Sequence, residues 1–172
     1  MSNTKKMTVS GLCLALCLLL PFLTGQIQKI GNMLCPMHLP VLLCGMICGW
    51  PWGLAVGAVA PLLRSVLWGM PPMYVAIAMA FELAAYGLVT GLIFPRTKQD
   101  LKGIYIALVI AMAAGRLVWG AVRFVMAGLS GSAFPMSAFL SGAVLTAWPG
   151  IVLQLILVPA VIRALQKSGQ LN

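Results

Sequence analysis

The sequence predicts an all-α integral membrane protein, with a single domain over residues 1–172 and six transmembrane helices. Of the 172 residues, 62% are hydrophobic and only 8% are charged, and the mean hydropathy is +1.04. A soluble domain of this size needs far more charge on its surface. Apolar segments that approach the ~20 residues needed to cross a bilayer also follow one another along the chain, separated by short turns.

Three of the expected helices lie in the N-terminal half. The first, at residues 7–24, follows two lysines as a signal peptide does, but no small-residue cleavage site before a polar mature region comes after it. We therefore expect a retained helix. A polar break at 26–32 leads to a short second helix at 37–49. The sequence Trp-Pro-Trp-Gly at 50–53 predicts a tight turn with interfacial tryptophans, before a third helix at 53–68.

Three further helices are expected in the C-terminal half, at residues 74–94, 104–127 and 139–165. Glycine-containing loops precede the first and the last of them, at 69–72 and 128–135. The connection at 95–102 is the most charged stretch of the interior chain. We expect Pro149 and Pro159 to bend the last helix, because an interior proline removes a backbone hydrogen bond.

Basic residues flank the apolar segments and determine the predicted orientation. Six crossings place both termini on one side, and the N-terminus, the 95–102 connection and the C-terminus all carry lysine or arginine. Such segments stay in the cytoplasm, so we expect cytoplasmic N- and C-termini. The outer loops carry only Lys29 as a clear charge. This pattern accounts for the net charge of +9 without nucleic acid as a partner.

Few residues in the chain favour catalysis or metal binding. The five cysteines have no surrounding set of His, Asp or Glu, so we expect them to pack as small apolar side chains. The chain has one histidine, two acidic residues and no P-loop sequence. No nucleophile with a base can be assembled from these residues, so we expect no enzyme activity, no metal and no cofactor.

Three arginines and one carboxylate lie within the predicted helices, namely Arg64, Arg116, Arg123 and Glu82. A cation at the centre of a transmembrane helix costs at least ~2.5 kcal/mol by insertion scales, so such side chains face protein, water or a ligand. One carboxylate cannot neutralise three arginines. A negatively charged or strongly hydrogen-bonding ligand is therefore the expected partner.

The positions of these residues predict one pocket that is reached from the outer side. Arg64 lies eleven residues beyond Gly53, about 16 Å along a helix. Arg116, Trp119 and Arg123 are spaced three and four apart, so they share one helix face. Glu82 is expected near the middle of its helix and completes the set.

Structural roles for the same residues stay open. In one alternative, Arg116 and Glu82 form an internal ion pair and Arg123 extends to the outer interface. Trp119 either lines the pocket or anchors its helix at the lipid interface. His38 either contacts a ligand from the first outer loop or caps the second helix.

Two stretches carry a resemblance to a known family. The first reads MHLPV from Met37, followed by Gly45 and by GWPWGL from Gly49; the second reads GMPP from Gly69 and MAFELAAYG from Met79. These stretches are similar to the second-to-third helix region, the third loop and the fourth helix of the substrate-binding S components of energy-coupling factor (ECF) vitamin transporters. The resemblance extends over roughly residues 8 to 165.

The resemblance implies a six-helix subunit that binds a water-soluble vitamin or related micronutrient at the outer face of a bacterial cytoplasmic membrane. Such subunits dock on a transmembrane T component, which couples to two cytoplasmic ATPases. Gly11 and Ala15 match the family's contact motif for the T component, with glycine in place of the first alanine. Loops one, three and five and helices four to six then form the substrate site.

The arginines favour an anionic substrate such as pantothenate, folate or lipoate, and disfavour the cation thiamine. A queuosine precursor or another nucleobase-like ligand fits the tryptophans but not the charge. Two other functions are compatible with the residues: a stand-alone carrier or channel with Glu82 as the titrating group, and a membrane scaffold whose arginines pair internally. No inverted repeat is visible in the sequence, which disfavours the carrier.

Overall fold

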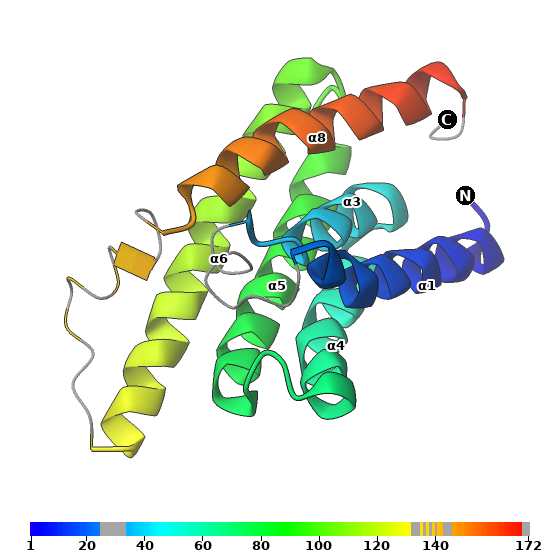
Figure 1. The fold of residues 1–172 in the computed structure, drawn as a ribbon. Helices are drawn as coiled ribbons and strands as arrows, with labels where there is room; N and C mark the ends of the chain where they lie inside the picture. The colour runs from blue at the N-terminus through cyan, green and yellow to red at the C-terminus, as the bar shows by residue number, and fades with distance from the viewer. Residues whose placement is uncertain are drawn as a thin grey trace.

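The computed structural model describes residues 1–24, 34–131, 135, 137, 139, 141–142 and 146–169. The expected polar break at 26–32, Lys29, and parts of the 128–135 loop and of the 139–165 helix lie outside these residues. The described elements are all helical (Figure 1). They are α1 (Asn3–Leu19), η1 (Leu20–Thr24), α3 (His38–Cys48), α4 (Trp50–Trp68), α5 (Met73–Ile93), η2 (Phe94–Arg96), α6 (Leu101–Leu129) and α8 (Trp148–Lys167).

Five helices in the described part of the chain are long and apolar enough to cross a bilayer, and α3 is the shorter sixth. With 11 residues, α3 is about 16 Å long, roughly half the thickness of the hydrocarbon core. Nine of those residues are buried, so α3 runs inside the bundle rather than along its surface. The short second helix expected from the sequence is therefore a half-length helix that does not cross the bilayer on its own.

One turn and one bend differ from what the sequence predicts, and in both cases a proline lies in the first turn of a helix. The turn between α3 and α4 is Gly49 alone, with φ +93°, and Trp50–Gly53 already belong to α4. Pro51 fits there because the first helical turn has no intrahelical acceptor for its missing N–H. In the same way Pro149 lies in the first turn of α8 and does not bend it, whereas Pro159 lies inside this helix as expected.

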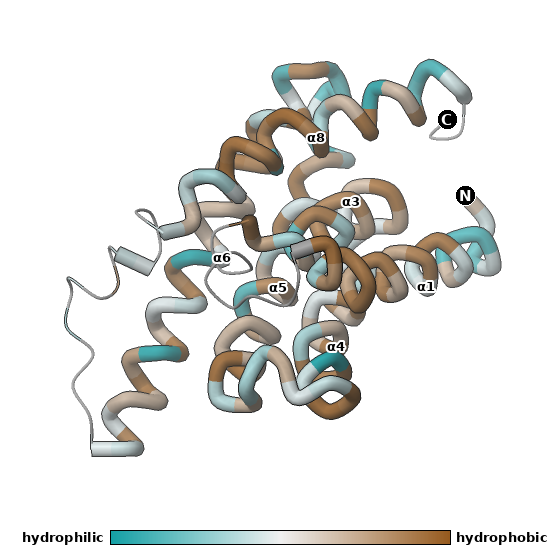
Figure 2. The backbone as a smooth tube through the Cα atoms, in the orientation of Figure 1, coloured by the Kyte–Doolittle hydropathy of each residue, from teal (hydrophilic) through white to brown (hydrophobic). Residues whose placement is uncertain are grey.

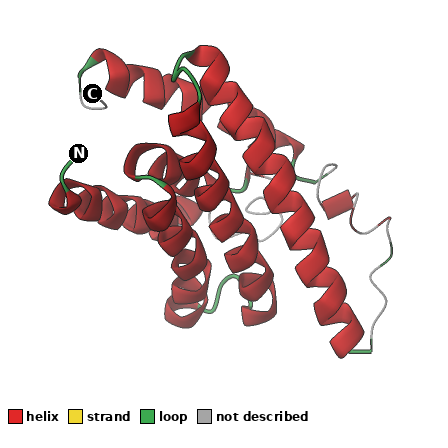
Figure 3. Ribbon diagram, turned by 180° about the vertical axis from the view of Figure 1, so that it is seen from behind, coloured by secondary structure: helices red, strands yellow, loops and turns green. Residues whose placement is uncertain are grey.

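The three basic stretches meet at one end of the bundle. The Gln166 side-chain amide donates to the Gln99 carbonyl at 2.7 Å, which joins the end of α8 to the connection before α6. Cys48 donates to the Lys6 carbonyl at 3.6 Å, which joins the end of α3 to the start of α1. The two termini lie on the same side of the bundle in both views (Figures 1 and 3). The sequence predicts both termini on one side; the six crossings and the cytoplasmic orientation of this end stay predictions.

The hydropathy of the chain agrees with this arrangement of an apolar bundle with hydrophilic stretches at one end. The tube is hydrophobic along most of α3, and hydrophilic stretches lie toward the N-terminus of α1 and at the connection between α5 and α6 (Figure 2). Hydrophilic bands also interrupt the C-terminal half of α6 (Figure 2), the part of the chain that carries two of the three intramembrane arginines.

Glycines bring α3, α4 and α5 into direct backbone contact. A Cβ atom on Gly53 would lie 2.7 Å from the Gly45 Cα atom and 2.7 Å from the Gly87 carbonyl oxygen. A Cβ atom on Gly57 would collide with the Leu83 carbonyl, and one on Gly91 would collide with the Trp50 backbone. Close approach of this kind is how membrane helices associate without a hydrophobic driving force between them.

Cysteine and serine side chains attach α1 to α3. Cys44 donates to Ser10 Oγ at 3.5 Å, and Cys17 donates to the Met37 carbonyl at 3.5 Å. All five cysteines of the chain are buried free thiols. The opposite face of α1, which includes Gly11 and Ala15, is exposed.

We predict that Gly57→Ala lowers the melting temperature by several degrees, because the added methyl group forces α4 and α5 apart and overpacking typically costs about 1–3 kcal/mol. Melting of the purified protein in detergent measures this effect. Gly128→Ala in α6 is the matched control, since nothing lies within 4 Å of a Cβ atom there. Equal melting of the two variants would contradict the close contact of α4 with α5.

Candidate functional site

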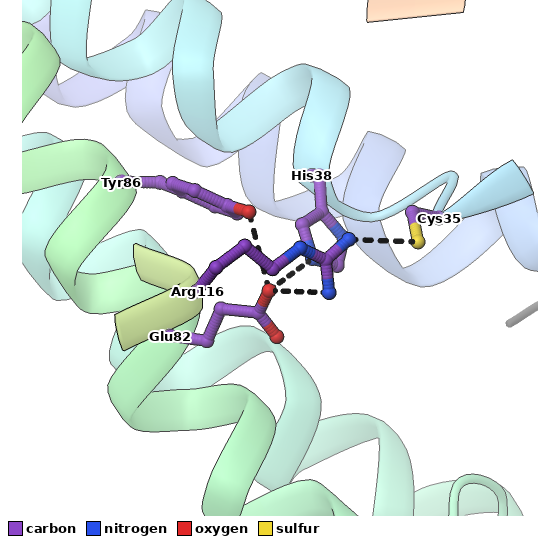
Figure 4. Close-up of polar contacts among 5 residues, drawn as sticks. All are labelled: Cys35, His38, Glu82, Tyr86 and Arg116. Carbon is purple, nitrogen blue, oxygen red and sulfur yellow. Dashed lines mark hydrogen bonds and ion pairs between the residues drawn. The ribbon is translucent and has the colours of Figure 1, made fainter. Parts of the chain in front are cut away.

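Four polar side chains form a buried cluster between α3, α5 and α6 (Figure 4). Arg116 Nη1 lies 2.9 Å from Glu82 Oε1, and the Tyr86 hydroxyl donates to the same oxygen at 3.2 Å. His38 Nε2 lies 3.5 Å from that oxygen. The side chains of Glu82 and His38 are 2% and 3% exposed, and that of Arg116 is 15% exposed. An ion pair so enclosed in a membrane protein needs the additional donors to offset its loss of water.

The half-length helix α3 positions His38. Cys35, just before α3, adopts a left-handed backbone with φ +46°, and its carbonyl accepts a hydrogen bond from the His38 N–H at 3.1 Å. His38 is the first residue of α3, so the N-terminus of this helix begins beside Glu82. The partial positive charge of a helix N-terminus favours a carboxylate there. Arg116 Nη2 also lies 3.9 Å from Cys35 Sγ.

Local sequence spacing positions the other members. Glu82 and Tyr86 are four residues apart on α5 and therefore share one helix face. Gly115 on α6 leaves room for the Tyr86 ring, with which a Cβ atom at that position would collide. The Tyr86 ring also packs against His38, with centroids 5.2 Å apart. These contacts hold the phenol oxygen at the carboxylate.

Several buried polar atoms of the cluster have no hydrogen-bond partner among the residues that the structure describes. They are both ring nitrogens of His38 and Nε of Arg116. His38 Nε2 is near Glu82 without the geometry of a hydrogen bond. Such atoms normally find partners, because each unsatisfied buried group costs about 1–3 kcal/mol.

An aromatic group surrounds Arg123, further along α6. The guanidinium of Arg123 lies 4.8 Å from the ring centroid of Tyr74 and 6.0 Å from that of Trp119. Trp119 in turn stacks on Phe139, with centroids 6.2 Å apart and an angle of 30° between the planes. Gly142 lies against the edge of Trp119, where a Cβ atom would approach the indole to 2.7 Å. Flat rings and a cation together suit a planar or anionic ligand group.

Arg64 lies in a different place from the other predicted site residues. It is 2% exposed, donates to the Leu18 carbonyl on α1, and stacks over the rings of Phe22 and Trp68 at 4.8 and 5.5 Å. In a 3₁₀ turn the Leu18 carbonyl accepts the N–H of residue 21, but that residue is a proline. Arg64 supplies a donor there, so it completes the end of α1 and joins α1 to α4.

The structure therefore brings His38, Glu82 and Arg116 together as one cluster and places Trp119 and Arg123 in the adjoining aromatic group. Tyr86 is not among the site residues predicted from the sequence, although its spacing of four from Glu82 is a usable signal. The contribution of Cys35 had no signal in the sequence, because Cys35 lies between the expected helices. Phe139 begins the expected sixth helix, but the sequence does not show that its ring stacks on Trp119. No group of three or more metal-ligating side chains occurs in the described ranges.

We predict that Arg64→Met destabilises the protein by about 1.5–3 kcal/mol, the usual contribution of a hydrogen bond from a charged group. Unfolding in detergent, followed by circular dichroism, measures the loss. Arg163→Met is the control, since Arg163 is an exposed arginine near the C-terminus of α8. If both variants unfold alike, Arg64 does not stabilise the end of α1.

Comparison with known proteins gives one match. A family model described as "ECF transporter, substrate-specific component" matches residues 5–162, which is most of the chain. No curated protein matches the sequence, and no solved structure matches it.

Proposed function

The chain belongs to the family of substrate-specific components of ECF transporters, and from this we propose that it captures one water-soluble, vitamin-like micronutrient at the outer face of the membrane. Members of this family are non-catalytic membrane subunits that bind substrate. We propose high affinity and an anionic substrate, with pantothenate, folate and lipoate as examples. The ligand contacts come from His38, Glu82 and Arg116 and, toward the outer ends of the helices, from Trp119 and Arg123.

The observation that supports this proposal most strongly is the buried cluster around Glu82. Placing an arginine, a carboxylate and a histidine together inside a membrane bundle is costly, and functional sites are where such arrangements are retained. The nitrogens of His38 and Arg116 that have no partner among the described residues add hydrogen-bonding capacity to the site. The cation and aromatic rings around Arg123 extend the same surface along α6.

Uptake is driven by partner subunits in this proposal. The chain has no P-loop sequence, and we infer that a transmembrane T component with two cytoplasmic ATPases supplies the energy in a bacterial cytoplasmic membrane. The exposed face of α1 at Gly11 and Ala15 is the proposed docking surface for the T component. Small residues there allow the backbone of a partner helix to approach closely.

Native mass spectrometry of the protein, purified gently from its own cells, tests substrate capture. We expect a bound small acid in the wild type. Arg116→Ala and Arg123→Ala should each weaken its binding by ~2 kcal/mol or more, because each removes a charged contact from a desolvated site. Arg163→Ala is the control with the same loss of charge. A wild-type protein that never carries or binds a small molecule would favour a scaffold.

We predict that Ala15→Leu leaves substrate binding unchanged but abolishes uptake in cells, because the larger side chain separates α1 from its partner helix. Binding to the purified protein and uptake of labelled substrate are the two measurements. Leu12→Ala, on the same exposed face, is the control for a change of size in the opposite direction. Normal uptake by Ala15→Leu would remove this face as the docking surface. Uptake in vesicles that lack the ATPases would instead indicate a stand-alone carrier, in which Glu82→Gln should abolish transport.

A further inference from the structure

Among the residues that the structure describes, the contacts to the Glu82 carboxylate are all made at one of its two oxygens. Three side chains approach Oε1: Arg116 at 2.9 Å, Tyr86 at 3.2 Å and His38 at 3.5 Å. In Figure 4 every dashed line to Glu82 ends on this oxygen, and none ends on the second carboxylate oxygen, Oε2. A carboxylate oxygen is a strong acceptor, and inside a protein it normally has a donor.

Donors without acceptors lie in the same cluster. Among the residues that the structure describes, Arg116 Nε is buried without a hydrogen-bond partner, and so is His38 Nδ1 on a residue that is 2% exposed. Within the described part of the chain, the cluster therefore offers an acceptor, Glu82 Oε2, and donor capacity on Arg116 and His38 that the contacts to Oε1 do not use. A ligand that satisfies both must carry a hydrogen-bond donor next to a hydrogen-bond acceptor.

Charge excludes a second anion at this position. Glu82 already balances Arg116 across 2.9 Å. A ligand carboxylate at Arg116 would also lie beside Glu82, and two like charges so close together repel each other strongly in a site with little water. An uncharged group avoids that repulsion and can still accept a hydrogen bond from Arg116.

We propose that the group bound at this cluster is an uncharged amide-type edge, in which an N–H stands next to a C=O, as in an amide, lactam or cyclic ureide. Its N–H donates to Glu82 Oε2, and its carbonyl oxygen accepts from Arg116 Nε or from His38. The anionic end of the substrate then lies toward Arg123 and the aromatic rings. This inference rests on the proposed function and specifies which acids the site takes.

The experiment compares acids that differ in this edge. In the first pair, biotin carries a cyclic ureide and lipoate carries a dithiolane, each on the same kind of carboxylate side chain. In the second pair, pantothenate contains an amide and nicotinate does not. Each acid is titrated into the full-length protein in detergent, after bound molecules have been removed by dialysis, and the shift in melting temperature and the Kd are measured. We expect biotin or pantothenate to bind at least tenfold tighter than its counterpart.

Two variants assign the effect to the cluster. Glu82→Gln keeps an oxygen for the three donors but replaces the acceptor Oε2 by an amide donor, and it should weaken binding of the preferred acid at least tenfold. Arg116→Lys keeps the charge beside Glu82 but removes Nε, and it should weaken binding to a similar extent. Arg163→Lys is the matched control and should bind like the wild type. Melting of each variant without ligand shows whether it is folded.

The outcomes separate this inference from the proposed function. Binding of lipoate or nicotinate as tight as that of the amide-containing acids overturns the amide edge but leaves substrate capture intact. Unchanged affinity in folded Glu82→Gln or Arg116→Lys likewise overturns it. Binding of none of the four acids overturns the inference and also counts against capture of a small vitamin-like acid.

Discussion

The ion pair between Glu82 and Arg116 is the interaction around which the bundle is organised. It joins α5 to α6 through side chains that are 2% and 15% exposed, so little solvent stabilises either charge and neighbouring elements have to maintain the geometry of the pair. Tyr86 and His38 hold the ion pair in this geometry, and the position of each depends on a further structural feature. Tyr86 requires Gly115 on the facing helix, and His38 requires a helix that begins inside the bundle.

The glycine contacts between α3, α4 and α5 also hold the residues of this cluster in position. Because the backbones of these helices touch at Gly45, Gly53 and Gly87, the position of α3 relative to α5 is fixed without long side chains. The distance between His38 at the start of α3 and Glu82 on α5 follows from that contact. A site built from rigid helix crossings keeps its polar atoms in place at little cost in side-chain entropy when a ligand binds.

Hydropathy and proline or glycine signals predict most of the helices, because the bilayer imposes length and composition directly. The sequence predicts that the second helix, at 37–49, is short, but it does not show that this helix begins inside the bundle beside Glu82. The sequence also does not show that Arg64 has a different role from Arg116 and Arg123. All three are cations in apolar segments, and only the tertiary position of Pro21 and Leu18 shows that Arg64 completes a helix end. Spacing along one helix was informative for Arg116, Trp119 and Arg123, because all three lie on α6.

The half-length helix α3 has a consequence for how water and ions are kept from the ion pair. Its buried apolar turns run from the polar cluster to Gly49, at the end of the bundle where the basic stretches meet. Each unit charge that crosses the membrane dissipates about 2.3 kcal/mol for every 100 mV of potential. Among the described residues, the buried apolar side chains of α3 separate the ion pair from that end of the bundle, and water and ions enter such a packed apolar segment only at high cost.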